Sequence, residues 1–467
     1  MSCFRYVVLL LLGGGWLLTA SVPSAAQDPA AISVEEYPIN LVMFHDPQLQ
    51  VGSITLVLTN ELKVLWLKAM DRGDSELQRM ALDSFKLAQE RGMKDLKDTH
   101  ARLADLLKVP KQDSIVHRAA VHTLVHLNAR EYAQVLAESA KSHGLTIAIL
   151  VEPALARWKS DLLTDAWLSR IDDPHASLVM RMLAIDGLGE TEEIKAASSL
   201  KRIAANSRAI ANERIAAARA LSKMHAPGLA NVASSLVGAK SQPVLLNSVL
   251  ALELMNALDS DEVIALLKRL VAHDSTAIQS GALQQLYAID PRHVYEFAEV
   301  AIKSKDSGVR MVGAQTLIVQ KQAKWIAPLA TLLDDVNPTL RRHVAKAMFQ
   351  LASEPELQQE VITQATAVLN QNGWRGIEQA TIVLVLLDHK PAGDRLVELL
   401  PHARPEIMDA SAWGLRMLAL PEHLPVMLAR AQRLDTELRA SDPPYLAPGV
   451  DIQLSQLFLA FGQMQHM

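Results

Sequence analysis

The chain has 467 residues, of which 50% are apolar, 4% aromatic and 21% charged, and its formal net charge is −5. So high an apolar content with so little net charge excludes a disordered chain. The single cysteine, Cys3, excludes a disulfide scaffold, a cysteine-ligated zinc module and an iron–sulfur protein. The charge balance supplies no basic footprint for nucleic acid, so no nucleic-acid partner is expected.

Residues 1–26 have the three parts of a secretory signal peptide. A short start with one cation, Arg5, precedes the apolar run Val7–Leu18, and the small residues of Ser24–Ala26 provide a cleavage site before Gln27. The alternative is an uncleaved membrane anchor. Residues 7–22 make up about 16 apolar positions, fewer than the roughly 20 that span a bilayer. We therefore expect cleavage near Ala26.

Cleavage would change the composition of the exported chain. Loss of Arg5 and Cys3 takes the net charge from −5 to −6 and leaves no cysteine. Cys3 precedes the apolar run, so it is not placed for lipidation. The longest later apolar runs, Leu145–Val151 and Thr381–Leu387, are too short to cross a membrane. We expect a periplasmic or extracellular protein with no transmembrane segment in the mature chain.

The remaining chain divides into three predicted parts. Residues 27–60 fit the later pattern poorly and are predicted to form an extended lead-in with an atypical cap. Residues 61–440 carry a helical repeat, in which apolar residues recur at spacings of three and four. After the break at Asp442–Pro444, the apolar segment Val450–Phe461 predicts a capping helix within residues 441–467.

The repeat consists of an apolar residue, a small residue four positions later and an apolar residue four positions after that. Positions four apart share one face of a helix, so the small residue allows a neighbouring helix to approach closely. The central positions are Ala120, Ala184, Ala217, Ser248, Ala282, Gly313, Val344, Ala380 and Ser411. They lie 31 to 36 residues apart except for one gap of 64, where a degenerate unit is expected around Ile147–Leu155.

This period, with two helices per unit, predicts an all-α fold: an α-solenoid of stacked antiparallel helix pairs. About ten or eleven units would cover the chain from Leu77 to Leu459. Glu190–Glu193 is predicted to open one of the helices, where carboxylates favour the helix dipole.

The loop before the second helix of a unit has its own signature. Asp113, Asp306 and Asn337 occupy positions where a helix N-cap is needed. A cation follows in the first turn and could reach the neighbouring unit's acidic loop, forming a ladder. The cations are Arg181, Arg214, Arg310 and Arg341. If exposed, each pair would contribute about 0–1 kcal/mol and would set register more than stability.

The segment Leu332–Arg341 and the helix after it resemble the HEAT-repeat family in its short bacterial form. The resemblance covers roughly residues 75–440 and is clearest over 170–350. It implies antiparallel helix pairs stacked into a curved superhelix, whose second helices line the inner face and commonly bind proteins there. The unit at 140–165 and the wide interval between Val344 and Ala380 depart from the family pattern.

A search for catalytic motifs is negative. The sequence has no phosphate-binding loop, no GxSxG elbow, no HExxH zinc motif and no CxxCH haem site. Some proteins that resemble HEAT repeats are metal hydroxylases whose sites are built on His-Glu pairs. No histidine in this sequence is followed by glutamate. Nothing points to the bilin site of the HEAT-like bilin lyases. We therefore expect no enzyme activity and no cofactor.

His122 and His126 are the best metal candidates, because residues four apart lie on one face of a helix. His117 falls on a different face, and His143 is assigned to a later helix. Two imidazoles are too few for a zinc site without a further ligand. The competing interpretation is a pair of surface histidines, so no metal site is predicted.

The candidate partner-binding residues are Trp374, Arg375 and Arg342. Trp374 and Arg375 are expected in a turn before a helix, where an aromatic ring beside an arginine is a good binding anchor. The competing interpretation places the ring in a gap between repeats. Core packing is the expected role of the other tryptophans in helical patterns. These are Trp158, Trp167, Trp325 and Trp413.

These observations predict an exported, non-catalytic scaffold that binds a protein partner on the concave face of the solenoid. Two alternatives remain open at this point. One is an accessory subunit or enzyme whose metal site is completed in three dimensions. The other is a binding module for an envelope polysaccharide, which would need a row of exposed aromatics in a chain with 4% aromatic residues.

Overall fold

A computed structural model describes residues 58–238, 243–256, 258–440 and 448–464. Over these ranges the regular structure is entirely helical, with no β-strand. The predicted signal peptide at 1–26, and the lead-in as far as residue 57, lie outside the described residues. No helix in the described ranges is long and apolar enough to cross a membrane.

The helices form consecutive pairs, and within each pair the second helix packs on the first. The first helices are α2 Asn60–Met70, α4 His100–Leu107, α6 Ala133–Ser142, α8 Thr164–Asp172, α10 Ala197–Ala205, α12 Leu229–Gly238, α14 Asp261–Val271, α16 Ala298–Ala301, α18 Ile326–Thr331, α20 Pro355–Leu369, α22 Ala392–Leu399 and α24 Leu424–Ala440. The second helices are α3 Ser75–Glu90, α5 Ser114–His126, α7 Leu145–Arg157, α9 Leu178–Glu190, α11 Ala211–Lys223, α13 Val244–Met255, α15 Thr276–Ile289, α17 Ser307–Val319, α19 Pro338–Leu351, α21 Trp374–Leu386, α23 Pro405–Leu418 and α25 Val450–Met464.

Short 3₁₀ turns accompany half of the first helices. They are η1 Lys97–Thr99, η2 Arg130–Tyr132, η3 Ile194–Ala196, η4 Pro291–Val294, η5 Ala323–Trp325, η6 Leu332–Asp334 and η7 Pro421–His423. Five of them lead directly into a first helix, η4 is separated from α16 by residues 295–297, and η6 follows α18. The α16 and α18 helices, each of which follows such a turn, are the shortest of the first helices.

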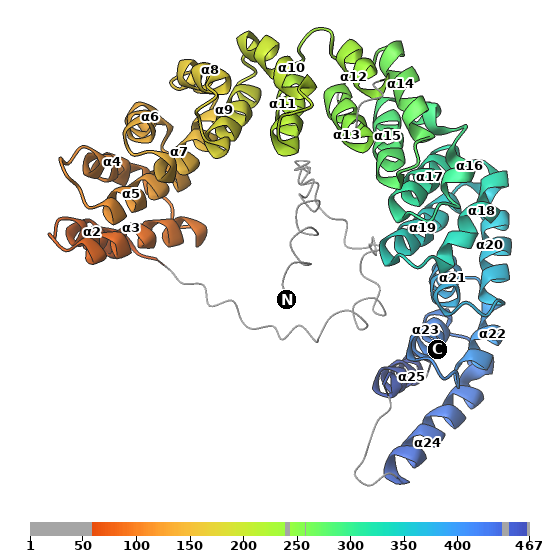
Figure 1. Ribbon diagram of the computed structural model, residues 1–467. Helices are drawn as coiled ribbons and strands as arrows, with labels where there is room; N and C mark the ends of the chain where they lie inside the picture. The colour runs from red at the N-terminus through yellow and green to blue at the C-terminus, as the bar shows by residue number, and fades with distance from the viewer. Residues whose placement is uncertain (1–57, 239–242, 257, 441–447, 465–467) are drawn as a thin grey trace, which may run out of the picture. The chain divides into compact units, whose positions relative to one another are not determined.

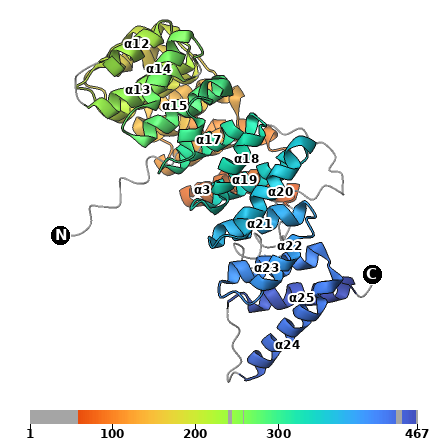
Figure 2. The same ribbon diagram turned by 90° about the vertical axis from the view of Figure 1, so that its right-hand side faces the viewer.

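The second helices stack on one another in chain order. Each one from α3 to α25 packs on the next second helix, and the first helices form the other layer (Figure 1). The order α21, α23, α25 is also plain in Figure 2. This arrangement confirms the predicted α-solenoid. We call the helices α3 to α25 with odd numbers the second-helix layer.

The small-residue frame marks where the second helices meet their neighbours. All of its central positions are buried, and the degenerate unit is α7, where Val151 is fully buried. Gly313 shows why small residues are needed: a Cβ there would lie 2.9 Å from the Cβ of Ala301 in α16. From Met70 to Val312 the buried apolar side chains form one cluster, and buried apolar residues continue from there to Met464.

The predicted caps form as expected. Asn337 Oδ1 accepts hydrogen bonds from the amides of Thr339 and Leu340, at 2.9 and 3.1 Å, and Pro338 occupies the first position of α19. Asp306 and Asp113 cap α17 and α5 in the same way. Side-chain acceptors satisfy amides that have no partner inside the helix, which fixes where each second helix begins.

The arginine ladder exists, but its pairs are not exposed. Arg181 Nε lies 2.7 Å from Glu213 Oε1 of the next unit, and Glu213 is buried. Arg214 continues the series with a neutral partner, Asn247 Oδ1, at 3.3 Å. Arg341 departs from the pattern, since it donates to carbonyls of its own loop, those of Asp335 and Val336. The estimate for exposed pairs therefore does not apply to the buried members.

The array contains one or two helix pairs more than the ten or eleven predicted. The first pair begins with α2 at Asn60, next to the predicted start of the array at residue 61, and the described residues contain twelve pairs. At the other end, α25 (Val450–Met464) packs on α23, with Met408, Leu434 and Val450 in a separate small cluster.

Candidate functional site

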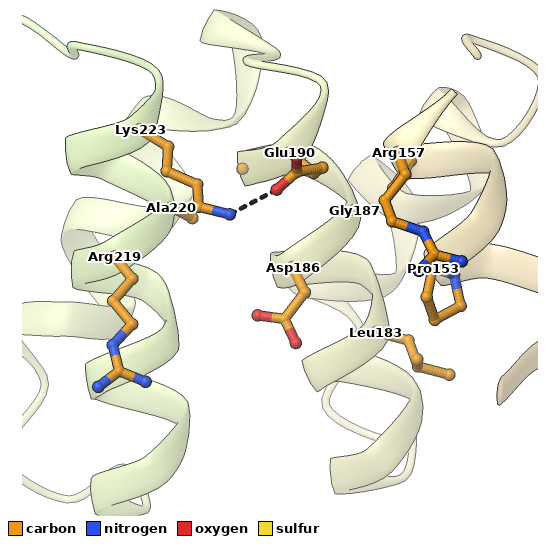
Figure 3. A pocket seen from close by; sticks show the side chains of 11 residues that line it. Pro153, Arg157, Leu183, Asp186, Gly187, Glu190, Arg219, Ala220 and Lys223 are labelled. Carbon is orange, nitrogen blue, oxygen red and sulfur yellow. Dashed lines mark hydrogen bonds and ion pairs between the residues drawn. The ribbon is translucent and has the colours of Figure 1, made fainter. Parts of the chain in front are cut away.

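In the described residues, two of the hollows in the second-helix layer lie where consecutive second helices meet. The first, which we call the α9 hollow, has a volume of about 240 Å³ and opens between α7, α9 and α11 (Figure 3). Its lining residues are Pro153, Ala156, Arg157, Leu183, Asp186, Gly187, Gly189, Glu190, Arg219, Ala220 and Lys223. All of them belong to second helices. The layer is therefore indented where consecutive second helices meet.

Two glycines of α9 set the dimensions of the α9 hollow. A Cβ on Gly187 would lie 2.8 Å from the Trp167 ring of α8, and one on Gly189 would lie 2.7 Å from Cα of Ala220 in α11. Trp167 is held there by its indole N–H, which donates to Glu152 at 2.9 Å. The glycines thus let α9 approach both neighbours closely.

The α9 hollow is lined by side chains of both positive and negative charge. Asp186 is exposed between α9 and α11, with Arg219 on the facing helix (Figure 3). Desolvation raises the pKa of Asp186, while Lys223 and Arg219 act to lower it. Lys223 pairs with Glu190, and Arg219 pairs with Glu253 at 2.7 Å. A partner side chain of either charge would meet an opposite charge here.

Glu190 corrects one prediction. The run Glu190–Glu193 was expected to open a helix, yet Glu190 is the last residue of α9 and Glu192 has a positive φ of 58°. Only Glu193 acts as a cap, accepting from the Lys195 amide at 3.2 Å. At the C-terminal end of a helix a carboxylate opposes the dipole. The pairing of Glu190 with Lys223 offsets that repulsion.

The second hollow, which we call the α5 hollow, has a volume of about 570 Å³ and lies between α3, α5 and α7. Its lining residues are Arg79, Asp83, Lys86, Ser114, Ile115, His117, Arg118, Ala119, His122, His143, Thr146 and Ile147. Here, too, every lining residue except His143 belongs to a second helix.

The two metal candidates both face α3. Lys86 Nζ donates to His122 Nδ1 at 3.0 Å, and His126 Nε2 lies 3.6 Å from Glu90 Oε1. Desolvation is the main cause that lowers the pKa of His122, and Lys86 adds to it. No group of three potential metal ligands occurs in the ranges that the structure describes. His122 therefore lies in the α5 hollow as a lining residue beside a cation.

His117 and His143 form a contact that the sequence did not predict. Their rings stack with centroids 3.9 Å apart and planes inclined by 24°. His117 Nε2 lies 2.5 Å from Ser139 Oγ. The sequence predicts that His143 belongs to a later helix. In the structure His143 is instead the C-cap residue that follows α6. Desolvation lowers the pKa of His117, and His143 adds to the effect.

Trp374 lies among arginines at the start of α21. The guanidinium carbons of Arg375 and Arg404 lie 4.6 and 4.7 Å from its ring centre, and that of Arg341 lies 5.9 Å away. The ring is half-buried and belongs to the first turn of a helix instead of the turn before it. Arg342 is not part of this cluster; it is exposed on α19, where it donates to the Pro338 carbonyl at 3.4 Å.

Of the four tryptophans with a predicted core role, two are buried and two are half-buried. Trp167 and Trp413 are buried, in agreement with the predicted core role. Trp158 and Trp325 are only half-buried. The Trp325 indole donates to Gln320 Oε1 at 2.9 Å, and the Lys324 ammonium lies over its ring.

Comparison with known proteins finds likeness of structure only. No protein-family model and no curated protein matches the sequence. Among solved structures, the chain is similar to one of Kap95p with RanGDP (TM-score 0.47, 12% identity, 87% of this chain and 56% of that chain). It is also similar to importin beta (TM-score 0.41, 11% identity, 87% of this chain and 55% of that chain). A third similar structure is the CpcE–CpcF complex of phycocyanin lyase from Nostoc sp. PCC7120 (TM-score 0.30, 18% identity, 55% of this chain and 94% of that chain). The chain thus spans a little over half the length of the first two.

Proposed function

We propose that this protein is an exported, non-catalytic scaffold that binds a protein partner on its second-helix layer. The observation that carries the proposal is that the α9 hollow is lined entirely by second helices, and the α5 hollow almost entirely. Concave, partly apolar places with a few charged groups are where proteins receive partner side chains. A repeated second helix offers several such places along one layer.

Exposed apolar side chains in the same layer support the proposal. Met80, Ile115, Ile149 and Val179 belong to the successive second helices α3, α5, α7 and α9. Their exposed fractions are 54%, 55%, 43% and 47%. Apolar side chains interspersed with charged ones are typical of interfaces that form between soluble proteins.

Export is supported by the predicted signal peptide at residues 1–26 and by the lack of cysteine after Cys3. The measurement is Edman or mass-spectrometric sequencing of the N-terminus of the protein recovered from the envelope or medium. We expect it to begin at Gln27. A protein recovered only from the cytoplasm with Met1 intact would contradict export.

The binding face can be tested by site-specific photo-crosslinking. A photoreactive amino acid at His122, Asp186 or Lys223 samples the second-helix layer, and one at Glu138 or Arg202 samples exposed positions of the first helices α6 and α10. We expect one protein partner to crosslink from the second-helix positions and not from the first-helix controls. Equal adducts from both layers, or adducts from the controls alone, would contradict the proposed face.

A further inference from the structure

The α5 hollow is cationic, although the whole chain is not. Its lining includes Arg79, Lys86 and Arg118 but only one carboxylate, Asp83. The formal net charge of the chain is −5. The sign of the charge in this hollow is therefore opposite to that of the molecule. Such a local reversal favours a ligand with negative charge.

The single carboxylate is already shared. Asp83 Oδ2 accepts from Arg79 at 2.5 Å, and its Oδ1 lies 2.7 Å from Lys86 Nζ. Arg79 is further held by Glu76, one turn earlier on α3. Asp83 therefore cannot neutralise the other side of the hollow.

Arg118 supplies the charge that remains available. It lies on α5, is exposed, and forms no ion pair within the part of the chain that the structure describes. His122, one turn further along α5, contacts Lys86 and lines the same hollow. An arginine with an unused planar guanidinium is suited to a carboxylate, because both groups are flat and bond in pairs.

The walls of the hollow are apolar beside these cations. Ile115 lines it and is 55% exposed, and Ala119 and Ile147 complete the apolar part. A volume of about 570 Å³ has room for a few side chains. A free inorganic anion is strongly hydrated and gains nothing from an apolar wall, whereas a peptide offers both kinds of group.

We propose that the α5 hollow binds an acidic segment of the protein partner, with a carboxylate on Arg118 and an apolar side chain against Ile115. This inference rests on the proposed function, of which it names the partner chemistry. It assigns to the partner a segment that contains both Asp or Glu and aliphatic residues. Binding should weaken as salt is added, since exposed charge pairs are screened.

The test uses three octapeptides of identical length, (Glu-Leu)₄, (Gln-Leu)₄ and (Lys-Leu)₄, each titrated into the mature protein and followed by fluorescence anisotropy. We expect (Glu-Leu)₄ to bind most tightly and (Lys-Leu)₄ least. Arg118→Glu should weaken (Glu-Leu)₄ by about tenfold or more, and Arg118→Lys should retain much of the affinity. Arg208→Glu, the same charge change at an exposed arginine outside both hollows, should leave the affinity unchanged.

Equal binding of the three peptides, or full affinity in Arg118→Glu, would overturn the proposal. Inorganic phosphate competing as strongly as (Glu-Leu)₄ would also overturn it, because the site would then be a simple anion site. Arg118 is exposed, so circular dichroism should show that its variants fold. If second-helix crosslinks to the partner persist in Arg118→Glu at full yield, this inference fails alone. If no second-helix position crosslinks, the proposed function itself fails.

Discussion

Arg310 of α17 and Asp335 of the next unit form a buried, bidentate ion pair. Arg310 Nε and Nη2 donate to the two carboxylate oxygens at 2.6 and 2.7 Å. The side chains are only 9% and 7% exposed. Arg310 also donates to the carbonyls of Ser304 and Lys305 in its own loop. One side chain therefore fixes both the loop before α17 and the position of the next unit.

Removal of Arg310 should destabilise the local contact strongly. In Arg310→Ala, Asp335 keeps a buried charge without its partner, which typically costs about 3–5 kcal/mol. The matched control is Arg219→Ala, whose pair with Glu253 is solvent-exposed on the arginine side and should contribute less than about 1 kcal/mol. Native-state hydrogen exchange measures the local free energy of opening, in α17 and α19 for Arg310→Ala and in α11 and α13 for Arg219→Ala. If the two variants lose similar amounts of local free energy of opening, the buried arginine pairs do not stabilise the stack more than exposed pairs do.

A glycine at the contact between α16 and α17 gives a second prediction. In Gly313→Ala, the added Cβ would lie 2.9 Å from both the Ala301 Cβ and the Ile302 backbone nitrogen, so the helices must separate. Overpacking of this kind costs about 1–3 kcal/mol. Gly238→Ala in α12 is the control, since nothing lies within 4 Å of its added Cβ. We expect a lower melting temperature for the first variant and no loss for the second.

The packing side of the second helices could be predicted from the sequence, whereas the lining of the two hollows could not. Small residues such as Ala120, Ala184 and Ala217 mark the buried face because close helix approach demands them. The caps at Asp306 and Asn337 could also be predicted, because few residue types can accept hydrogen bonds from the unpaired amides of a helix's first turn. Both signals are local, so a single sequence contains them.

The hollows depend on the next helix in the stack, which is about 32 residues away. Two and six positions after the small residue, α9 places Asp186 and Glu190, and α11 places Arg219 and Lys223. These spacings could have been read from the sequence. Which charges face one another could not be read, because that depends on the register between neighbouring helices. The cluster of arginines around Trp374 combines residues of α19 and α21 with Arg404, the N-cap of α23, for the same reason.

Asp409 should make the stability of the C-terminal units depend on pH. It is 2% exposed on α23, and within the described residues its Oδ1 has no hydrogen-bond partner. Desolvation, with Asp451 and Glu406 nearby, raises its pKa to about 8. In the unfolded chain the same carboxyl ionises near pH 4, so between about pH 5 and 7 unfolding releases a proton and rising pH favours unfolding.

The comparison of wild type with Asp409→Asn isolates this effect. The variant has no proton to release, so the wild type should lose about 1.4 kcal/mol of stability per pH unit relative to it. Urea unfolding followed at α23 and α25 by hydrogen exchange, at pH 5, 6 and 7, gives the difference directly. A difference that stays constant with pH would show that Asp409 ionises normally in the folded protein.

The His117–His143 stack predicts a loss of stability in acid. The folded-state pKa of His117 is lowered, first by desolvation and then by His143. In the unfolded chain a histidine binds its proton near pH 6.5, so below that pH unfolding takes up a proton and the contact between α5 and α6 weakens. NMR titration should give His117 a pKa below 6.5 in the wild type. His143→Phe, which keeps a stacked ring without its charge, should raise that pKa; an unchanged value would contradict the contribution of His143.

The central claim, that a partner lies on the second-helix layer, is tested most directly by hydroxyl-radical footprinting of the free protein and of the complex with its crosslinked partner. The method reports exposed side chains one by one. The account predicts protection of Met80, Ile115, Ile149 and Val179 in the second helices, with Val300 of α16 and Leu428 of α24 unchanged. Protection of Val300 and Leu428 while the second-helix residues stay reactive would contradict it.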